Sequence, residues 1–411
     1  MLNTPYTIIK SWNDQLLAEP DFMSLNQAND LLPVHFDSKS DSAFRPYNVV
    51  LITMESFSFE HISYYYPGKN TTPFFDSLLR NTISFPNTFA NAKRSIEGIP
   101  AVITSLPALM DQPFINSAYN VNKINSLASL LKPLGYRSGF FHGGNNGTMG
   151  FDNFTRLAGY EKYFGKNEFD GDLKDYDGHW GIFDHSYFSF MIRQLNSWKP
   201  PFHAAFFSIS SHHPYKVPAS YQNRIDLTTP PIEQGMAYAD AALADFFREA
   251  SQQSWYNNTI FVITSDHSGP AGTAYSANRL GAYHIPLLFI IPGEEKYKVH
   301  LETAQQCDIL PSVLHLLNYS GKYSSFGRNL FDSEKGWSVN YSNNSWQLIT
   351  DQYILLFDGQ ESTHLYSRED IYLKKNLIRK ESAAVPEMEN FLKAILQQYR
   401  YSLIHNQLVK P

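Results

Sequence analysis

The chain has 411 residues, of which 43% are hydrophobic, and it carries a formal net charge of −6 at pH 7. This length suffices for one large α/β domain with a smaller appendage. Only 18% of the residues are charged and no basic run occurs, which argues against a nucleic-acid partner. The single cysteine, Cys307, excludes an internal disulfide and a cysteine-based zinc site.

Strand and helix patterns alternate from about residue 45 to residue 335. Residues 1–44 before them are polar and mixed, and we interpret them as an arm or linker. Unbroken apolar runs predict buried strands, and apolar residues at helical spacing predict helices. The predicted strands are 48–54, 137–142, 201–210, 259–264 and 285–291, and the predicted helices are 72–81, 99–105, 127–134, 232–251 and 308–317. This alternation predicts a three-layer α/β sandwich, with helices on both faces of a mostly parallel sheet.

The pattern changes after about residue 336. Short strands are expected at 345–351, 353–357 and 363–367, and a helix is expected at 385–399. The turn signal Asp358-Gly359 lies between the second and third of these strands. We therefore predict a small C-terminal α+β subdomain with an antiparallel sheet over residues 336–411.

Polar side chains follow the ends of two predicted strands. Glu55 comes directly after the strand 48–54, and Asp266 and His267 follow the strand 259–264. In open α/β sheets, ligands bind outside the carboxyl ends of the strands. A carboxylate beside an imidazole suits a divalent cation. A turn aspartate that caps a helix, with an incidental histidine beside it, explains the same pair equally well.

Ser95 follows Lys93 and Arg94 in a loop that is expected before the helix 99–105. A hydroxyl beside basic side chains, near a helix N-terminus, can attack or hold a phosphate group. A simple serine N-cap is the commoner explanation of such a motif.

A histidine pair, His212 and His213, follows the strand 201–210 and precedes Pro214. Imidazoles in this position can bind an anionic oxygen or protonate a leaving group. Together with the groups above, they supply metal ligands, a hydroxyl nucleophile and an acid, which metal-assisted group transfer requires.

The ordered motifs resemble the lipoteichoic acid synthase and phosphoglycerol transferase branch of the alkaline phosphatase and sulfatase superfamily. The resemblance covers about residues 45–335 and implies a sulfatase-like catalytic domain there. It rests on the segments 48–56, 93–98, 211–214, 265–269, 306–312 and 326–330.

The resemblance implies one catalytic divalent cation held by four residues. These are Glu55, Ser95, Asp266 and His267. Manganese is the usual ion of the family, and zinc and magnesium are the alternatives. The family nucleophile is usually threonine, so Ser95 is a departure that keeps the hydroxyl group.

The family's substrate-side histidine corresponds to His212. Ser211 replaces the asparagine of that motif and His213 takes its variable position, which leaves the choice between the two histidines open. The further substrate-binding candidates are Arg94, His142, His213, Trp180 and His284.

The resemblance implies transfer of a phosphoglycerol group from a phospholipid headgroup donor to a glycan or polyol-phosphate acceptor. The group would pass through a covalent intermediate on Ser95, with His212 at the leaving oxygen. Alternatives at the same site are a phosphodiesterase or phosphatase and a phosphoethanolamine transferase, although members of the latter usually carry several disulfides. A sulfatase is disfavoured because the segment 95–99 lacks the proline and arginine of the formylglycine signature. An inactive envelope domain that binds glycans or lipid headgroups is the non-enzymatic alternative.

No apolar stretch of about 20 residues and no signal-peptide pattern occurs in the sequence. Family members usually carry N-terminal transmembrane helices. We therefore expect an extracytoplasmic domain that works near the membrane, with the membrane anchor outside this sequence.

Overall fold

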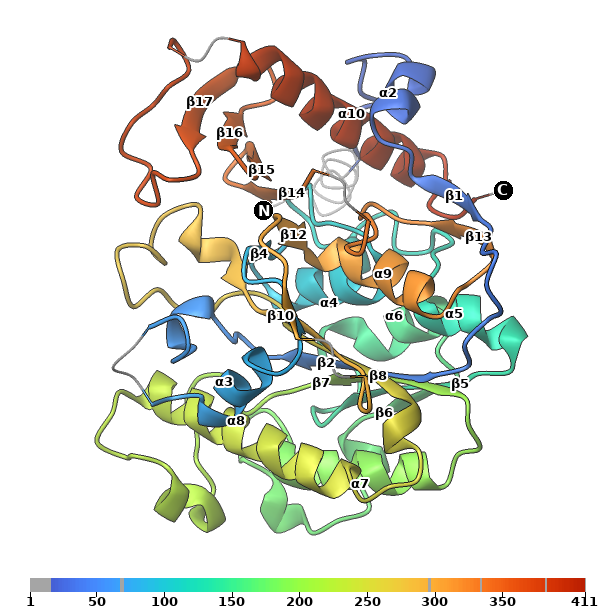
Figure 1. Cartoon of the computed structure of the whole chain (residues 1–411), viewed down its shortest axis with the longest axis vertical. Coiled ribbons are helices and arrows are strands. Elements are labelled where there is room, and N and C mark those ends of the chain that lie inside the picture. The colour runs from blue at the N-terminus through green and yellow to red at the C-terminus, as the bar shows by residue number, and fades with distance from the viewer. Residues whose placement is uncertain (1–15, 67–69, 295–296, 333–334, 381–382, 411) are drawn as a thin grey trace, which may run out of the picture.

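A twisted sheet runs through the middle of the computed structural model, which describes residues 16–66, 70–294, 297–332, 335–380 and 383–410. Its strand order is β11-β3-β10-β8-β2-β7-β5-β6 (Figure 1). β10 is antiparallel to both of its neighbours, and the remaining pairs are parallel. In that order the strands are Lys298–Val299, Ile83–Ser84, Leu287–Ile290, Thr259–Ser265, Asn48–Met54, Phe202–Phe207, Arg137–His142 and Lys162–Phe164.

Helices cover both faces of this sheet (Figure 1). Alternate side chains of β2 explain why: Val49 and Leu51 join one hydrophobic core, and Val50 and Ile52 join the other. One core includes α4 (Ser95–Thr104), α5 (Leu127–Leu131), α6 (Phe151–Leu157) and α9 (Ile309–Leu316). The other includes α3 (Pro73–Leu79), α7 (Asp184–Asn196) and α8 (Pro231–Ala250).

The C-terminal region forms a second, antiparallel sheet of β14 (Trp337–Ser342), β15 (Ser345–Thr350), β16 (Tyr353–Phe357) and β17 (Ser362–Ser367). The long helix α10 (Ala384–Ile404) packs on it, and the ring of Trp337 meets that of Phe391 edge-on at 5.2 Å. Figure 1 shows this region above the main sheet.

The described part of the N-terminal arm also packs against the C-terminal region. The arm contains α2 (Leu25–Leu31) and β1 (His35–Ser38), and β1 pairs with β13 (Gly321–Ser324). Gln397 of α10 donates a hydrogen bond to the carbonyl of Pro20 and accepts one from the amide of Phe22. Residues 1–15 lie outside the described residues.

These observations confirm the predicted fold class, and they correct several elements. α4 begins at Ser95 rather than Ile99, because the Arg94 carbonyl accepts the amides of Glu97 and Gly98. The strand predicted at 285–291 divides at Pro286, which has no N–H for a ladder. Its first part, β9 (His284–Ile285), joins a small sheet with β4 (Thr88–Phe89) and β12 (Ala304–Gln305).

α7 and β14 were not predicted at all. The domain boundaries at residues 45 and 336 stay predictions. Among the described helices, none is both long and apolar enough to cross a lipid bilayer.

Candidate metal centre

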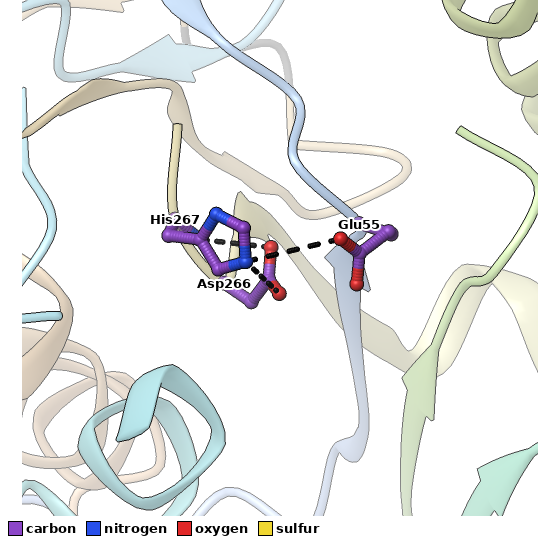
Figure 2. A group of neighbouring side chains, drawn as sticks. All are labelled: Glu55, Asp266 and His267. Carbon is purple, nitrogen blue, oxygen red and sulfur yellow. Dashed lines mark hydrogen bonds and ion pairs between the residues drawn. The ribbon is translucent and has the colours of Figure 1, made fainter. Parts of the chain in front are cut away.

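Two acidic side chains meet at the carboxyl ends of neighbouring strands. β2 and β8 are parallel and place Met54 beside Ser265, so the next residues, Glu55 and Asp266, leave the sheet side by side. Both are buried, at 3% and 0% exposure. Ligand atoms of Glu55, Asp266 and His267 lie within 4.8 Å of one another (Figure 2).

The helix α4 brings Ser95 to this cluster. The Ser95 hydroxyl lies 3.2 Å from Glu55 Oε2 and 3.3 Å from His267 Nε2. Gly98, one turn along, allows this approach, since a Cβ at that position would penetrate the backbone carbonyl of Asp266. Ser95 is the first residue of the helix, where backbone N–H groups have no intrahelical partner.

The imidazole of His267 has a defined orientation. Its Nδ1 lies 2.9 Å from the carbonyl oxygen of Ser268, which can only accept a hydrogen bond. Nδ1 of the neutral ring therefore carries the proton, and Nε2 keeps a lone pair. That nitrogen faces Asp266 Oδ2 at 3.2 Å and Glu55 Oε1 at 3.8 Å.

The electrostatics of the cluster fit a cation. Burial and the nearby charge of Asp266 hold the pKa of Glu55 well above its usual range. Asp266 Oδ1 accepts the amides of Ser56 and His267, whereas Oδ2, in the described part of the chain, accepts no hydrogen bond. Two carboxylates, an imidazole lone pair and a hydroxyl thus converge with no positive group between them. This is a donor set for one divalent ion.

Residues that the sequence did not single out hold these ligands in place. The Gln306 amide group donates to the carbonyls of Ser265 and Asp266, at 2.7 and 2.6 Å, and accepts the Asn91 amide. Ser56 adopts a left-handed backbone (φ 53°), and its hydroxyl donates to Glu55 Oε1 at 2.6 Å. Gln306 and Ser56 both lie within segments that carry the resemblance, 306–312 and 48–56, but neither residue was assigned a role.

The predicted substrate histidines lie on a loop that is tied to the same cluster. The Ser211 hydroxyl donates to the carbonyl of Glu55. His212 is half-buried, and its ring lies 4.2 Å from that of Trp180. The Trp180 indole N–H donates to the carbonyl of His213, whose side chain is exposed. The loop therefore holds the His212 ring in contact with the Trp180 ring.

Three other predicted residues lie in different environments. His142, at the end of β5, is buried, and burial lowers its pKa to about 4, so the ring is neutral at pH 7. The Arg94 guanidinium pairs with Glu97, and its role toward a phosphate stays a prediction. His284 has no ring nitrogen left for a ligand, because Nε2 bonds the Pro86 carbonyl and Nδ1 bonds the Tyr275 hydroxyl, both at 2.6 Å. It is a buried structural histidine that stacks on Phe59 at 3.5 Å.

Comparison with known proteins identifies the family. The sulfatase family model matches residues 47–319, about two thirds of the chain and all four of the clustered residues. The chain belongs to the sulfatase family. Among curated proteins, lipoteichoic acid synthase 1 of Bacillus subtilis (strain 168) is 26% identical over 352 residues. That match covers 79% of this chain and 54% of the relative, so the chain spans about half the length of this synthase.

Solved structures show the same fold. A protein in the alkaline phosphatase superfamily from Vibrio parahaemolyticus superposes with a TM-score of 0.84 at 21% identity, covering 95% of this sulfatase-family chain and 98% of its own. The lipoteichoic acid synthase LtaP from Listeria monocytogenes superposes with a TM-score of 0.78 at 20% identity, covering 95% and 100%. The similarity to lipoteichoic acid synthases that the motifs indicated is confirmed.

Proposed function

We propose that this sulfatase-family chain is a metal-dependent phosphotransferase. It would move a phosphoglycerol group from a phospholipid to a glycan or polyol-phosphate acceptor. The observation that carries this proposal is the convergence of the Ser95 hydroxyl with Glu55, Asp266 and His267 at one end of the sheet. Similarity to lipoteichoic acid synthases supports phosphoglycerol as the group transferred. The segment after Ser95 lacks the sulfatase signature, which disfavours sulfate-ester hydrolysis.

The cation would be held by Glu55, Ser95, Asp266 and His267. We propose manganese, which accepts carboxylate oxygens, with zinc and magnesium as the alternatives. When bound, the ion would lower the pKa of the Ser95 hydroxyl and offset the charge of the phosphate.

The chain's own residues then carry out two displacements. In the first, Ser95 Oγ bonds to phosphorus, and the bond from phosphorus to the acylated glycerol oxygen breaks. The proton of Ser95 passes to solvent, and His212 protonates the leaving oxygen, so diacylglycerol departs. The backbone N–H groups of the first turn of α4 would donate to the phosphate. In the second step an acceptor hydroxyl gives its proton to His212 and attacks phosphorus, the bond from phosphorus to Ser95 Oγ breaks, and Ser95 takes a proton back from solvent.

The substrate-binding candidates would contact different parts of the donor. Trp180 lies against His212 and offers an aromatic face for the glycerol headgroup. His142, Arg94 and His213 stay proposals for further substrate contacts. The protein would work on the extracytoplasmic side of the membrane, either periplasmic or on the outer face, where its lipid donor is found. We propose that the full-length protein is anchored there.

The test is incubation of the purified chain with phosphatidylglycerol labelled in the headgroup, with manganese or with a chelator. We expect diacylglycerol release only with manganese, and no release by Ser95→Ala. Label that appears in free glycerol phosphate rather than on an added glycan or polyol-phosphate acceptor would make the protein a phosphodiesterase. Preference for phosphatidylethanolamine would contradict the assigned headgroup.

A further inference from the structure

A pocket of about 390 Å³ lies on loops that continue from the metal centre, and none of the four clustered residues lines it. It lies between the loop that follows β7 and the turn that follows β8. Three pairs of residues form its apolar walls: Pro214 and Tyr215, Pro270 and Ala271, and Pro231 and Ile232 at the start of α8. Its volume is in the range of small-molecule sites.

Two of these three walls continue directly from loops of the metal centre. Pro214 follows Ser211 by three residues, and the Ser211 hydroxyl bonds the carbonyl of Glu55. Pro270 follows His267 by three residues, and the amide of Gly269 between them donates to the Ser58 hydroxyl at 2.6 Å. The pocket therefore shares two of its loops with the metal centre.

The pocket's chemistry differs from that of the cluster. Among the described residues that line it, none is Asp, Glu, Lys or Arg, and its titratable side chains are those of His61, His213 and Tyr215. Burial of a charged group against such walls is unfavourable. Proline, isoleucine and tyrosine surfaces suit an apolar, uncharged ligand.

A phospholipid donor has three parts, and each fits a different region. The phosphate suits the cation ligands, and the polyhydroxy headgroup suits the polar face of His212 and Trp180. We propose that the third part, the acylated glycerol, occupies the pocket between Tyr215 and Ala271. This inference rests on the proposed function, since it assigns the leaving group of that reaction. In the first displacement the phosphorus–oxygen bond breaks and the oxygen gains a proton, so the group that remains in the pocket is uncharged diacylglycerol.

The first experiment measures binding without catalysis. Dihexanoylglycerol, a short-chain form of the leaving group, is titrated into the purified chain by isothermal calorimetry. We expect one site in the wild type and a loss of affinity of at least about tenfold in Ala271→Asp and in Ile232→Asp, which bring a carboxylate to the pocket. Matched controls are Ala118→Asp and Leu227→Asp, both exposed and outside the pocket, and these should bind as the wild type does. Ala271 is on an exposed turn, so its variant tests the pocket even if Ile232→Asp fails to fold.

The second experiment measures turnover of dihexanoyl phosphatidylglycerol relative to glycerophosphoglycerol, which has no acyl chains. The two pocket variants should lose most of the preference for the acylated donor, and the two controls should keep it. No binding by the wild type, equal loss in the controls, or an unchanged donor preference would overturn the pocket assignment. If dihexanoylglycerol binds as expected but no phosphoglycerol is transferred from either donor, the pocket stands and the proposed function fails.

Discussion

The backbone of α4 positions Ser95, which is the first residue of that helix. Its hydroxyl reaches Glu55 and His267 from the first residue of the helix. Threonine, which the resemblance implies at this position, would hold the hydroxyl in fewer rotamers. In this chain the short distances to both neighbours show that serine still reaches the cluster.

Ser95→Ala should reduce transfer by at least about a thousandfold, because the variant lacks the hydroxyl that attacks phosphorus. Manganese affinity, measured by calorimetry, should fall by no more than about tenfold, since the three charged or imidazole ligands remain. Mass spectrometry of the wild type during turnover should find a phosphoglycerol adduct on Ser95. An adduct on Thr104 or Ser105 instead would contradict this assignment.

Gly98→Ala tests the approach of α4 to the strand end. The added Cβ would penetrate the Asp266 carbonyl, so the helix must shift and carry Ser95 with it. We expect manganese affinity to fall about tenfold or more, together with turnover. Gly235→Ala in α8 is the matched control, since there the nearest atom, 3.1 Å from the new Cβ, belongs to the side chain of Tyr215. Equal loss of metal affinity in both variants would show that the change is not specific to the Asp266 contact.

At the scale of elements, neighbouring parallel strands position the site. A buried histidine on one strand of the same sheet makes the stability of the fold sensitive to acid. His203 of β7 is fully buried, with Nδ1 at 3.2 Å from the Val49 carbonyl of β2 and Nε2 at 2.9 Å from the Tyr160 hydroxyl. Burial lowers the pKa of His203 to about 4, from an ordinary value of 6.5. The ring is therefore neutral in the folded protein and takes up a proton more readily when unfolded.

The lowered pKa of His203 gives the folded state a stability contribution that depends on pH. It is fully present above pH 6.5 and is lost as the pH falls toward 4. By pH 4 the loss is about 3 kcal/mol, at about 1.4 kcal/mol for each pH unit. Urea unfolding of His203→Gln at pH 7.5, 5.5 and 4.5 should therefore show a shallower fall in the free energy of unfolding than the wild type. His179→Gln, at an exposed histidine, should leave the wild-type slope unchanged.

At the scale of the molecule, the centre joins segments that are far apart in the chain. Glu55, Ser95 and Asp266 come from three different elements, and Gln306 links the Asp266 turn to Asn91. In the folded state, two buried carboxylates lie together with an imidazole lone pair. A cation at this point stabilises the folded chain, because the unfolded chain does not assemble the ligands.

Metal removal should therefore lower thermal stability. At a free manganese concentration one hundred times its Kd, the folded state gains about 2.7 kcal/mol over the chelated protein. Differential scanning calorimetry should show a higher Tm with manganese than with a chelator in the wild type. Asp266→Ala should show no such rise, because it removes a ligand that three backbone or side-chain groups hold in place. An equal manganese-dependent rise in Asp266→Ala would place the ion elsewhere.

Much of the main domain was predictable from local patterns. β2 and β5 have the predicted bounds. For β2 the reason is its continuous apolar run, which ends at turn residues and has few other structures available. α7 was missed although Tyr187, Met191 and Leu195 follow helical spacing and are buried in the core beneath the sheet. Polar residues are interspersed among these apolar positions, so the pattern was weaker than in a continuous apolar run.

The sequence by itself determined the ligand types and their places after strands, since side-chain chemistry and strand ends are local properties. Only the tertiary structure decided which candidates meet. Parallel pairing of β2 with β8 sets Glu55 beside Asp266, and the close approach at Gly98 brings Ser95 to them. The same packing encloses His284 between Phe59 and Phe89 and gives both of its ring nitrogens to internal partners. Contacts between residues so distant in the chain depend on strand order and helix packing, which a linear pattern does not specify.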